Sequence, residues 1–397
     1  MRLVALSIVS SVWTVGMLSA QPATERVAAV AVAGTVFLDK NGNGVRDQDE
    51  PGIANAIVSD QIGVVTTDAD GHFAMTASGY GLLFVEPPDG YAARGPFWRK
   101  AAAGAELAFP LVTVPNPRSF TFVHASDTHL GPESLPRTRR LEALVDSLKP
   151  AFVLITGDLV RDALRVSEPE AAGYFDLLGR ELGAFKVPVF LVPGNHDIFG
   201  IERHRSLVSP TNPLYGKRFY RSRFGPNYYA FNWGGIHFVG LDTVDYFDLE
   251  YYAHVDSAQV RWLGEDLARL PAGTPVVTFN HIPLVSGAQT IDGYDDESVA
   301  PTIIRLSGKY QFRHTVQNNS EVVDLIGPRL EIALGGHFHI REFLRYETRT
   351  GTHRFAQTAA VVGPPAGSGP LGIRSGITLY HVTDRKVDDG TFIALDP

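Results

Sequence analysis

The sequence contains no cysteine. Disulfide bonds, zinc sites built from thiolates, a lipid anchor attached through cysteine and a thiol nucleophile are therefore excluded. The sequence also lacks an excess of positive charge, because 35 lysine and arginine residues stand against 43 acidic residues, for a formal net charge of −8. That balance argues against general binding to duplex nucleic acid or to an anionic membrane surface.

One long hydrophobic run is present, at the N-terminus. Arg2 precedes an apolar segment from Leu3 to Leu18, and Ser19-Ala20-Gln21 follows it. This order is typical of a secretory signal peptide, with cleavage after Ala20. The alternative is a retained anchor, but the segment is barely long enough to span a bilayer. We therefore expect a signal peptide over residues 1–20 and a secreted or periplasmic protein with no membrane span after cleavage.

The remaining chain divides at Pro115-Asn116-Pro117, because proline disfavours both helix and central strand. Residues 28–115 predict a small all-β sandwich as an accessory domain. Its expected strands are separated by turn residues and cover Ala33–Leu38, Ala56–Ser59, Gly63–Thr67, Phe73–Thr76 and Leu82–Glu86.

Residues 118–397 alternate between strand and helix patterns, which predicts an α/β domain. A capping box with Ser167 and Glu170 predicts a helix through about Glu181. A second helix is predicted to begin after Asp256.

Five short polar motifs follow five apolar, strand-like runs of this second part. The runs are Phe120–Ala125, Ala151–Thr156, Val187–Val192, Pro275–Phe279 and Leu330–Leu334. The motifs supply carboxylate, amide and imidazole groups through Asp127 and His129, Asp158, Asn195 with His196 and Asp197, His281, and His337 with His339. Sites in open α/β sheets lie beyond the carboxyl ends of the strands, so we expect these groups to converge. Their chemistry suits Mn, Fe or Zn, and a carboxylate such as Asp158 can bridge two such ions.

The pattern D-x-H, G-D, G-N-H-D, N-H and G-H-x-H resembles the calcineurin-like metallophosphoesterase superfamily. The resemblance implies a four-layer α/β/β/α sandwich and two divalent transition metals. It places one ion on Asp127, His129, Asp158 and His339, and the other on Asp158, Asn195, His281 and His337. It also implies hydrolysis of a small phosphorylated substrate by metal-activated water, with His196 as the acid.

The chain departs from the common pattern at the carboxylate that pairs with the acid. Many relatives have aspartate three residues after the bridging one, whereas Arg161 stands there in this chain. Either Asp162 or Asp197 is expected to orient His196 instead. No role is assigned to the isolated histidines His124, His237, His254, His353 and His381.

A loop near the N-terminus fits the calcium-loop pattern D-x-[DN]-x-[DN]-G-x5-E. Its expected oxygen ligands are Asp39, Asn41, Asn43, the Val45 carbonyl, Asp47 and Glu50. The segments on both sides are not helical, so the stretch resembles calcium-binding β repeats of bacterial surface proteins and the N-terminal domain of some exported phosphoesterases. We expect a structural calcium ion, with an ion-free polar hairpin as the alternative.

The leading hypothesis is thus an exported two-metal phosphoesterase with an N-terminal β domain. One alternative is a surface binding protein that keeps the fold without turnover. Another concerns the specific activity, which the sequence leaves open between monoester hydrolysis, nucleotide pyrophosphatase and cyclic-nucleotide phosphodiesterase. Oligomeric state stays open as well.

Overall fold

The computed structural model describes residues 25–288, 302–348, 351–363 and 374–395. The predicted signal peptide lies outside these residues, so its expectation stays a prediction. Within the described part of the chain, no helix has both the length and the apolar character needed to cross a bilayer.

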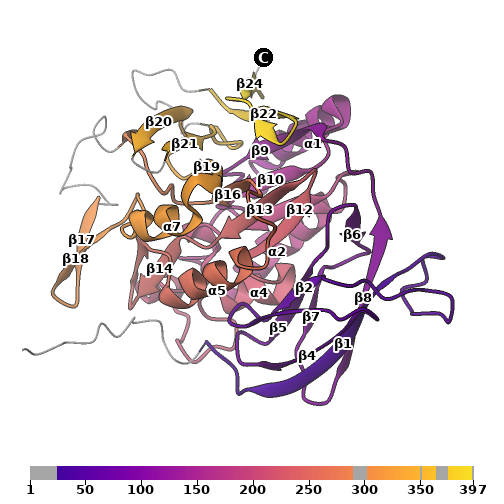
Figure 1. The fold of residues 1–397 in the computed structure, drawn as a ribbon. Helices are drawn as coiled ribbons and strands as arrows, with labels where there is room; N and C mark the ends of the chain where they lie inside the picture. The colour runs from indigo at the N-terminus through magenta and orange to yellow at the C-terminus, as the bar shows by residue number, and fades with distance from the viewer. Residues whose placement is uncertain (1–24, 289–301, 349–350, 364–373, 396–397) are drawn as a thin grey trace, which may run out of the picture.

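Two four-stranded sheets form the N-terminal β region, defined here as residues 25–113 (Figure 1). The first sheet has the order β4 (His72–Ala77), β1 (Val30–Leu38), β8 (Glu106–Thr113) and β6 (Tyr91–Ala93). The second has the order β3 (Val64–Thr66), β2 (Ile57–Ser59), β5 (Leu82–Glu86) and β7 (Trp98–Lys100). Alternation places Val36 and Phe109 of the first sheet against Val58 and Leu83 of the second, which is the packing of a β-sandwich. All five predicted strands are present, and β6, β7 and β8 add to them.

Two six-stranded sheets form the centre of the rest of the molecule. The β9 sheet consists of β11 (Val189–Val192), β10 (Val153–Thr156), β9 (Ser119–Ala125), β22 (Gly376–Thr383) and β23 (Lys386–Val387), with β24 (Thr391–Ala394) paired to β22. The β16 sheet has the order β12 (Tyr229–Trp233), β13 (Ile236–Leu241), β16 (Val276–Asn280), β19 (Leu330–Gly335), β21 (Gly351–Gln357) and β20 (Glu342–Thr348). Strands β9, β10 and β11 run parallel, as do β13, β16 and β19.

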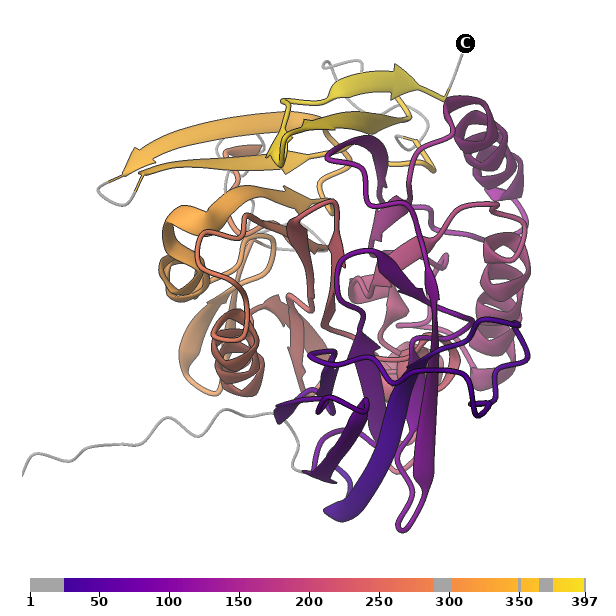
Figure 2. The same ribbon diagram turned by 45° about the vertical axis from the view of Figure 1, so that its right-hand side comes forward.

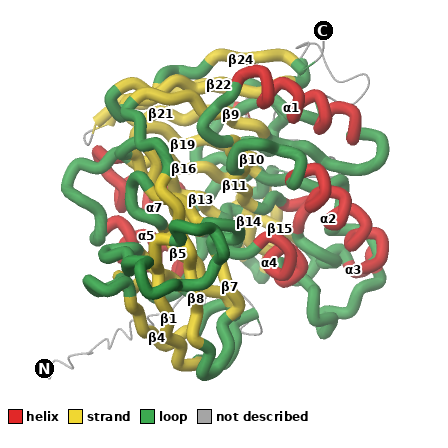
Figure 3. The backbone as a smooth tube through the Cα atoms, turned by 90° about the vertical axis from the view of Figure 1, so that its right-hand side faces the viewer, coloured by secondary structure: helices red, strands yellow, loops and turns green. Residues whose placement is uncertain are grey.

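Helices cover the outer face of each sheet (Figures 2 and 3). On the β9 sheet lie α1 (Leu135–Leu148) and α2 (Glu168–Leu182), and on the β16 sheet lie α5 (Ser257–Leu267) and α7 (Asn319–Ile326). Shorter elements are η1 (Asn195–Asp197), α3 (Arg203–Ser206), α4 (Arg218–Phe224), η2 (Gly327–Arg329) and the hairpins β14 (Val244–Phe247) with β15 (Glu250–Ala253) and β17 (Ile303–Leu306) with β18 (Lys309–Phe312). The predicted four-layer α/β/β/α sandwich, preceded by a β-rich region, is therefore present.

The core between the two central sheets is aromatic. Phe122 of β9 and Phe152, which immediately precedes β10, contact Phe238 of the β16 sheet, with ring centroids 5.6 and 5.1 Å apart. Because one cluster of buried side chains includes residues of both sheets, the two sheets are packed together. Their carboxyl ends therefore have a fixed relative position.

The two predicted helix starts differ. At α5, Asp256 accepts hydrogen bonds from the backbone N–H groups of Ala258 and Gln259. At α2, the Ser167 side chain makes no capping hydrogen bond, so the predicted capping box is wrong although the helix itself is present. Pro169 occupies the second helical position and has no N–H, which removes one of the two donors that a capping side chain uses.

Candidate metal centre

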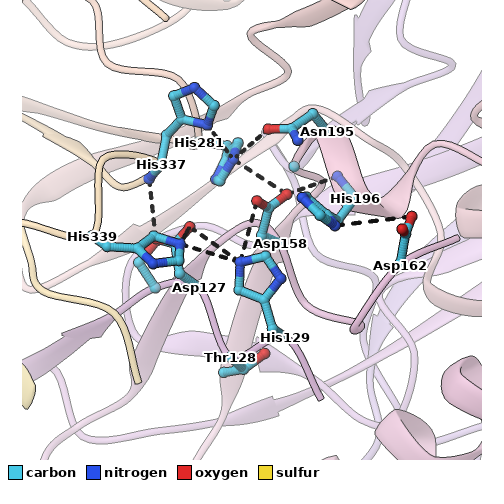
Figure 4. Close-up of polar contacts among 12 residues, drawn as sticks. Asp127, Thr128, His129, Asp158, Asp162, Asn195, His196, His281, His337 and His339 are labelled. Carbon is cyan, nitrogen blue, oxygen red and sulfur yellow. Dashed lines mark hydrogen bonds and ion pairs between the residues drawn. The ribbon is translucent and has the colours of Figure 1, made fainter. Parts of the chain in front are cut away.

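All five polar motifs lie at the carboxyl ends of central strands. Asp127, Asp158 and Asn195 follow β9, β10 and β11, whereas His281 and His337 follow β16 and β19. The ligands therefore come from the facing edges of both central sheets. They meet in one cluster, in which they point toward one another (Figure 4).

Two groups of possible ligands share Asp158. The first contains Asp127, His129 and His339, with His339 Nε2 lying 3.2 Å from both Asp127 Oδ1 and His129 Nε2. Asp158 Oδ2 lies 3.5 Å from His129 Nε2. This is the arrangement expected of a single ion site in which a carboxylate and two imidazoles face one centre.

The second group lies on the other side of the Asp158 carboxylate. His281 Nε2 is 3.3 Å from Asp158 Oδ1, 3.1 Å from Asn195 Oδ1 and 3.2 Å from His337 Nδ1. Because the two oxygens of Asp158 face different groups, the residue is placed to bridge two cations.

Hydrogen bonds around the cluster leave the ligand atoms free. His281 Nδ1 lies 2.8 Å from the carbonyl oxygen of Thr156, which can only accept, so Nδ1 carries a proton and Nε2 is the nitrogen directed at Asp158 and Asn195. Asp127 Oδ1 is buried and accepts no geometrically acceptable hydrogen bond from the described residues. Pairs of imidazole nitrogens face each other at 3.2 Å. These residues therefore fit two divalent cations.

Burial and neighbouring charges tune the ligands. Burial, together with the charge of His196, lowers the pKa of His129 to about 4. Burial and the neighbouring His314 lower the pKa of His337 well below its usual value. Burial opposes protonation of His281 as well, but the Asp158 carboxylate raises its pKa to about 9. His129 and His337 thus stay neutral, which is the form that binds metals.

Two glycines of the motifs are required by close packing. Gly157 has a φ of 79°, and a Cβ there would come within 2.6 Å of the Cβ of His281. At Gly194, a Cβ would overlap the Asp158 carboxylate. Both glycines therefore let the bridging carboxylate and its neighbours approach the strand ends.

His196 borders the first ligand group. Its backbone N–H donates to Asp158 Oδ1 at 2.8 Å, and its ring centroid lies 4.6 Å from that of His129. Its Nδ1 lies 3.0 Å from the carbonyl oxygen of Arg161, so Nε2 is the nitrogen left to act on a substrate. His196 also forms part of a compact group with His129 and Asp158.

The two candidate orienting carboxylates are placed differently. Asp162 Oδ1 is 3.9 Å from His196 Nδ1 and accepts hydrogen bonds from the backbone of Leu164 and Arg165. Asp197 is buried and accepts from the backbone N–H groups of Leu159, Val160 and Gly194. The structure therefore brings Asp162 near His196 and uses Asp197 to hold the loop that follows β10. The group nearest to His196 Nδ1 is the backbone carbonyl of Arg161. This contact could not be predicted from the sequence, because every residue has a backbone carbonyl.

One histidine at the centre was absent from the sequence expectations. His314 Nδ1 lies 2.6 Å from His337 Nε2, on the side of that ring opposite His281. It reaches the site from the segment after β18. Neither periodicity nor a recognisable motif marks this position, so only the tertiary structure reveals it.

The predicted calcium loop is folded around its own carboxylates. Asp39 accepts hydrogen bonds from the backbone N–H groups of Gly42 and Gly44, and Glu50 accepts from those of Lys40 and Asp47. The side-chain amides of Asn41 and Asn43 donate to Asp47 Oδ2. Among the described residues, the loop contributes no group of three acidic or histidine ligands within 4.8 Å. Calcium binding there remains a prediction.

The fold and the paired ligand groups define a candidate two-metal centre on a four-layer α/β/β/α scaffold. The calcineurin-like phosphoesterase family model matches residues 120–341, more than half of the chain, and the chain belongs to this family. The family resemblance expected from the sequence is thereby confirmed.

Curated relatives carry a phosphatase name. The human serine/threonine-protein phosphatase CPPED1 is 27% identical over 233 residues, which cover 57% of this chain and 63% of that protein. The protein of the same name from Pongo abelii is 26% identical over the same shares. The chain thus matches less than two thirds of the length of these relatives. Family and relatives together support a hydrolase.

Solved structures resemble the chain more distantly. A dimetal phosphatase from Danio rerio has a TM-score of 0.45 and 14% identity, covering 70% of this chain and 99% of that one. GAP50, described as the anchor in the inner membrane complex of Plasmodium, has a TM-score of 0.41 and 10% identity, covering 70% and 85%.

Proposed function

We propose that this protein is an exported, two-metal phosphoesterase that hydrolyses small phosphate esters with His196 as the acid. The observation that carries the proposal is the Asp158 carboxylate, whose two oxygens face two complete ligand groups. Export rests on the signal-like sequence of residues 1–20, which ends in small residues.

The distances within the cluster support the ligand sets that the family resemblance implies. Asp127, His129 and His339 would hold one ion, Asn195, His281 and His337 the other, and Asp158 would bind both. When bound, two divalent cations neutralise phosphate oxygens and make water a stronger nucleophile at neutral pH. The mixture of imidazole and carboxylate suits Mn, Fe or Zn.

The protein residues supply orientation and a proton. The Thr156 carbonyl fixes the tautomer of His281, and the Asp158 carboxylate is fixed by the His196 backbone N–H. The Arg161 carbonyl holds the His196 ring so that a proton on Nε2 can be delivered to the leaving oxygen of the ester. Asp162, whose Oδ1 lies 3.9 Å from His196 Nδ1, is the carboxylate placed to help orient that ring.

The test compares wild type with His196→Ala on a phosphomonoester, a phosphoserine peptide, a phosphodiester and a nucleotide pyrophosphate. Each protein is chelated and then reloaded with Mn, Zn or Fe. General acid catalysis contributes roughly 10²–10⁴-fold, so the variant should lose about that factor on its best substrate. His381→Ala is the matched control, because that half-exposed histidine pairs with Asp388 away from the centre.

Two results would contradict the proposal. Turnover that survives complete chelation would exclude the two-metal mechanism. Equal rates for His196→Ala and His381→Ala on every substrate would exclude His196 as the acid. The substrate with the highest kcat/KM then defines the specificity, which the described site leaves open.

We also infer that the N-terminal loop binds calcium as a structural ion. Its support is the complete ligand pattern from Asp39 to Glu50 and the turn at Gly44, which has a φ of 75°. Calcium should raise the thermal midpoint of wild type but not of Asp39→Asn. An unchanged midpoint in wild type would leave the loop as an ion-free hairpin.

A further inference from the structure

A second cluster of possible ligands lies where the N-terminal β region meets the β16 sheet. Glu86 ends β5, His237 lies in β13 and Asp266 lies in α5. One ligand atom from each lies within 4.8 Å of those from the others, and all three side chains are fully buried. Two carboxylates buried together without a cation are costly, because their repulsion is not screened by water.

This cluster is separate from the two-metal centre. His237 pairs with Val276 at the start of β16, whereas His281 follows Asn280 at the end of the same strand. The cluster therefore lies at the opposite end of the β16 sheet. No group of the phosphoesterase site takes part in it.

Three of the four carboxylate oxygens in the cluster have no hydrogen-bond donor among the described residues. Both oxygens of Glu86 and Oδ1 of Asp266 are buried without a hydrogen-bond partner among the described residues. The charge of Arg269 acts on Glu86 through space, but its guanidinium donates to the backbone carbonyl oxygens of Val64 and Glu265. Such unsatisfied buried groups call for a bound species or a proton.

The tautomer of His237 is fixed by Asn232, which faces the ring nitrogen that does not face Asp266. Asn232 donates through Nδ2 to the Pro87 carbonyl at 3.1 Å, so its Oδ1 faces His237 Nδ1 at 2.9 Å and accepts the proton there. A neutral His237 then presents the lone pair of Nε2 to Asp266 Oδ2, only 2.8 Å away. Two acceptors at that distance need a cation or a proton between them.

We infer that Glu86, His237 and Asp266 bind a third divalent cation, of the zinc type, which ties the N-terminal β region to the catalytic sheets. A divalent ion balances the two carboxylates. With Glu86 bidentate, the three residues supply four donor atoms, the number that a structural zinc site uses. The hydrogen bond from His237 Nδ1 to Asn232 is the outer-shell contact that metal-binding histidines make.

The rival occupant is a proton. Burial and the neighbouring Asp266 raise the pKa of Glu86 well above its usual value, so a protonated Glu86 beside an Asp266–His237 ion pair would also balance the charge. The two alternatives predict opposite effects for Glu86→Gln. An amide mimics a protonated carboxyl and can donate to Asp266, but it cannot replace a carboxylate that binds a metal.

The difference in burial between the two sites determines which ions a chelator can remove. His129 and His339 of the two-metal centre are partly exposed, with side chains 14% and 26% accessible, so a chelator can reach ions there. An ion among three fully buried side chains exchanges only when the two regions separate. Folded wild type, loaded with zinc and then dialysed against a chelator, should keep about one ion per chain as measured by elemental analysis.

Glu86→Gln treated identically should keep no ion and should unfold at a lower temperature. Glu25→Gln is the matched control, because Glu25 is also a buried carboxylate between the two regions but is fully paired with Arg221 and Tyr246. It should also be less stable, yet keep the ion. If Glu86→Gln fails to fold, anomalous scattering from crystals of the chelated wild type decides, with a single peak expected between Glu86 and Asp266.

Absence of a retained ion in wild type would overturn the inference, as would absence of the anomalous peak. Retention of the ion by Glu86→Gln would overturn the ligand assignment. A Glu86→Gln variant as stable as wild type would establish the shared proton instead. None of these outcomes depends on phosphoesterase activity.

Discussion

Five of the candidate metal-ligand residues have a positive φ. Asp127, His129, Asp158, His337 and His339 have φ angles of 53°, 38°, 46°, 76° and 58°. Non-glycine residues in this region cost about 1–3 kcal/mol each and persist where surrounding structure enforces them. The local strain turns each side chain from its strand end into the cluster. Ligand identity could be read from the motifs, but this backbone geometry could not.

Asp158 is the residue shared by the two proposed ion sites. We expect Asp158→Asn to weaken binding of both ions, because an amide offers one neutral oxygen where the carboxylate offers two charged ones. Elemental analysis should then show loss of both ions, and turnover should fall at least about 10²-fold.

Asp162→Asn is the control variant for Asp158→Asn. Its carboxylate is 3.9 Å from His196 and contacts none of the ligands, so ion content should stay at the wild-type level. An Asp162→Asn variant that lost ions as completely as Asp158→Asn would contradict the assignment of the bridging role.

At the scale of elements, strands and helices with strong local patterns were predictable. The five motif-bearing strands and α2 and α5 are present close to their predicted bounds. Strands β12 and β13 carried no clear local signal, because Tyr229 to Phe231 and Ile236 to Leu241 are buried on both faces and lack alternation. The capping box at Ser167 shows that a pattern match does not guarantee the hydrogen bond.

The N-cap residues of α5 and α2 are expected to contribute differently to the free energy of unfolding. Asp256→Ala should lower the free energy of unfolding by about 1 kcal/mol, since it removes two hydrogen bonds to the first turn of α5. Ser167→Ala should change it by less than about 0.5 kcal/mol, because Ser167 makes no cap bond. Urea denaturation measures both. Equal losses for the two variants would show that side-chain capping is not what distinguishes them.

At the scale of the whole molecule, the N-terminal β region and the catalytic sheets share a core. Phe84 of β5 packs edge-on against Trp262 of α5, at 6.3 Å between ring centroids. Gln61 donates to the carbonyl oxygen of Tyr228 at 3.0 Å. These contacts join positions more than a hundred residues apart, so no sequence pattern could predict them. For the same reason, no role could be predicted for His237.

Because of the buried pair of Glu25 and Arg221, the packing of the N-terminal β region against the central sheets depends on pH. Burial raises the pKa of Glu25, but the Arg221 charge and the hydrogen bonds from Arg221 and Tyr246 outweigh it, so the folded pKa lies below the usual 4.5. A carboxyl with a lowered folded pKa contributes stability above its unfolded pKa, and this is lost as pH falls through the folded value.

Thermal midpoints of wild type should therefore fall more steeply below pH 4.5 than those of Glu25→Gln. At neutral pH, the variant should be less stable by about 3–5 kcal/mol, because Arg221 is left buried without its partner. Parallel curves for the two proteins across the acid range would mean that Glu25 is not ionised in the folded state.

The central claim is that Asp158 bridges two cations held by the ends of both central sheets. Anomalous diffraction from a crystal loaded with Mn²⁺ tests it most directly. We predict two peaks about 3.5–4 Å apart on either side of the Asp158 carboxylate, one beside His129 and His339 and the other beside His281 and His337. A single peak, or peaks that do not contact Asp158, would contradict the account.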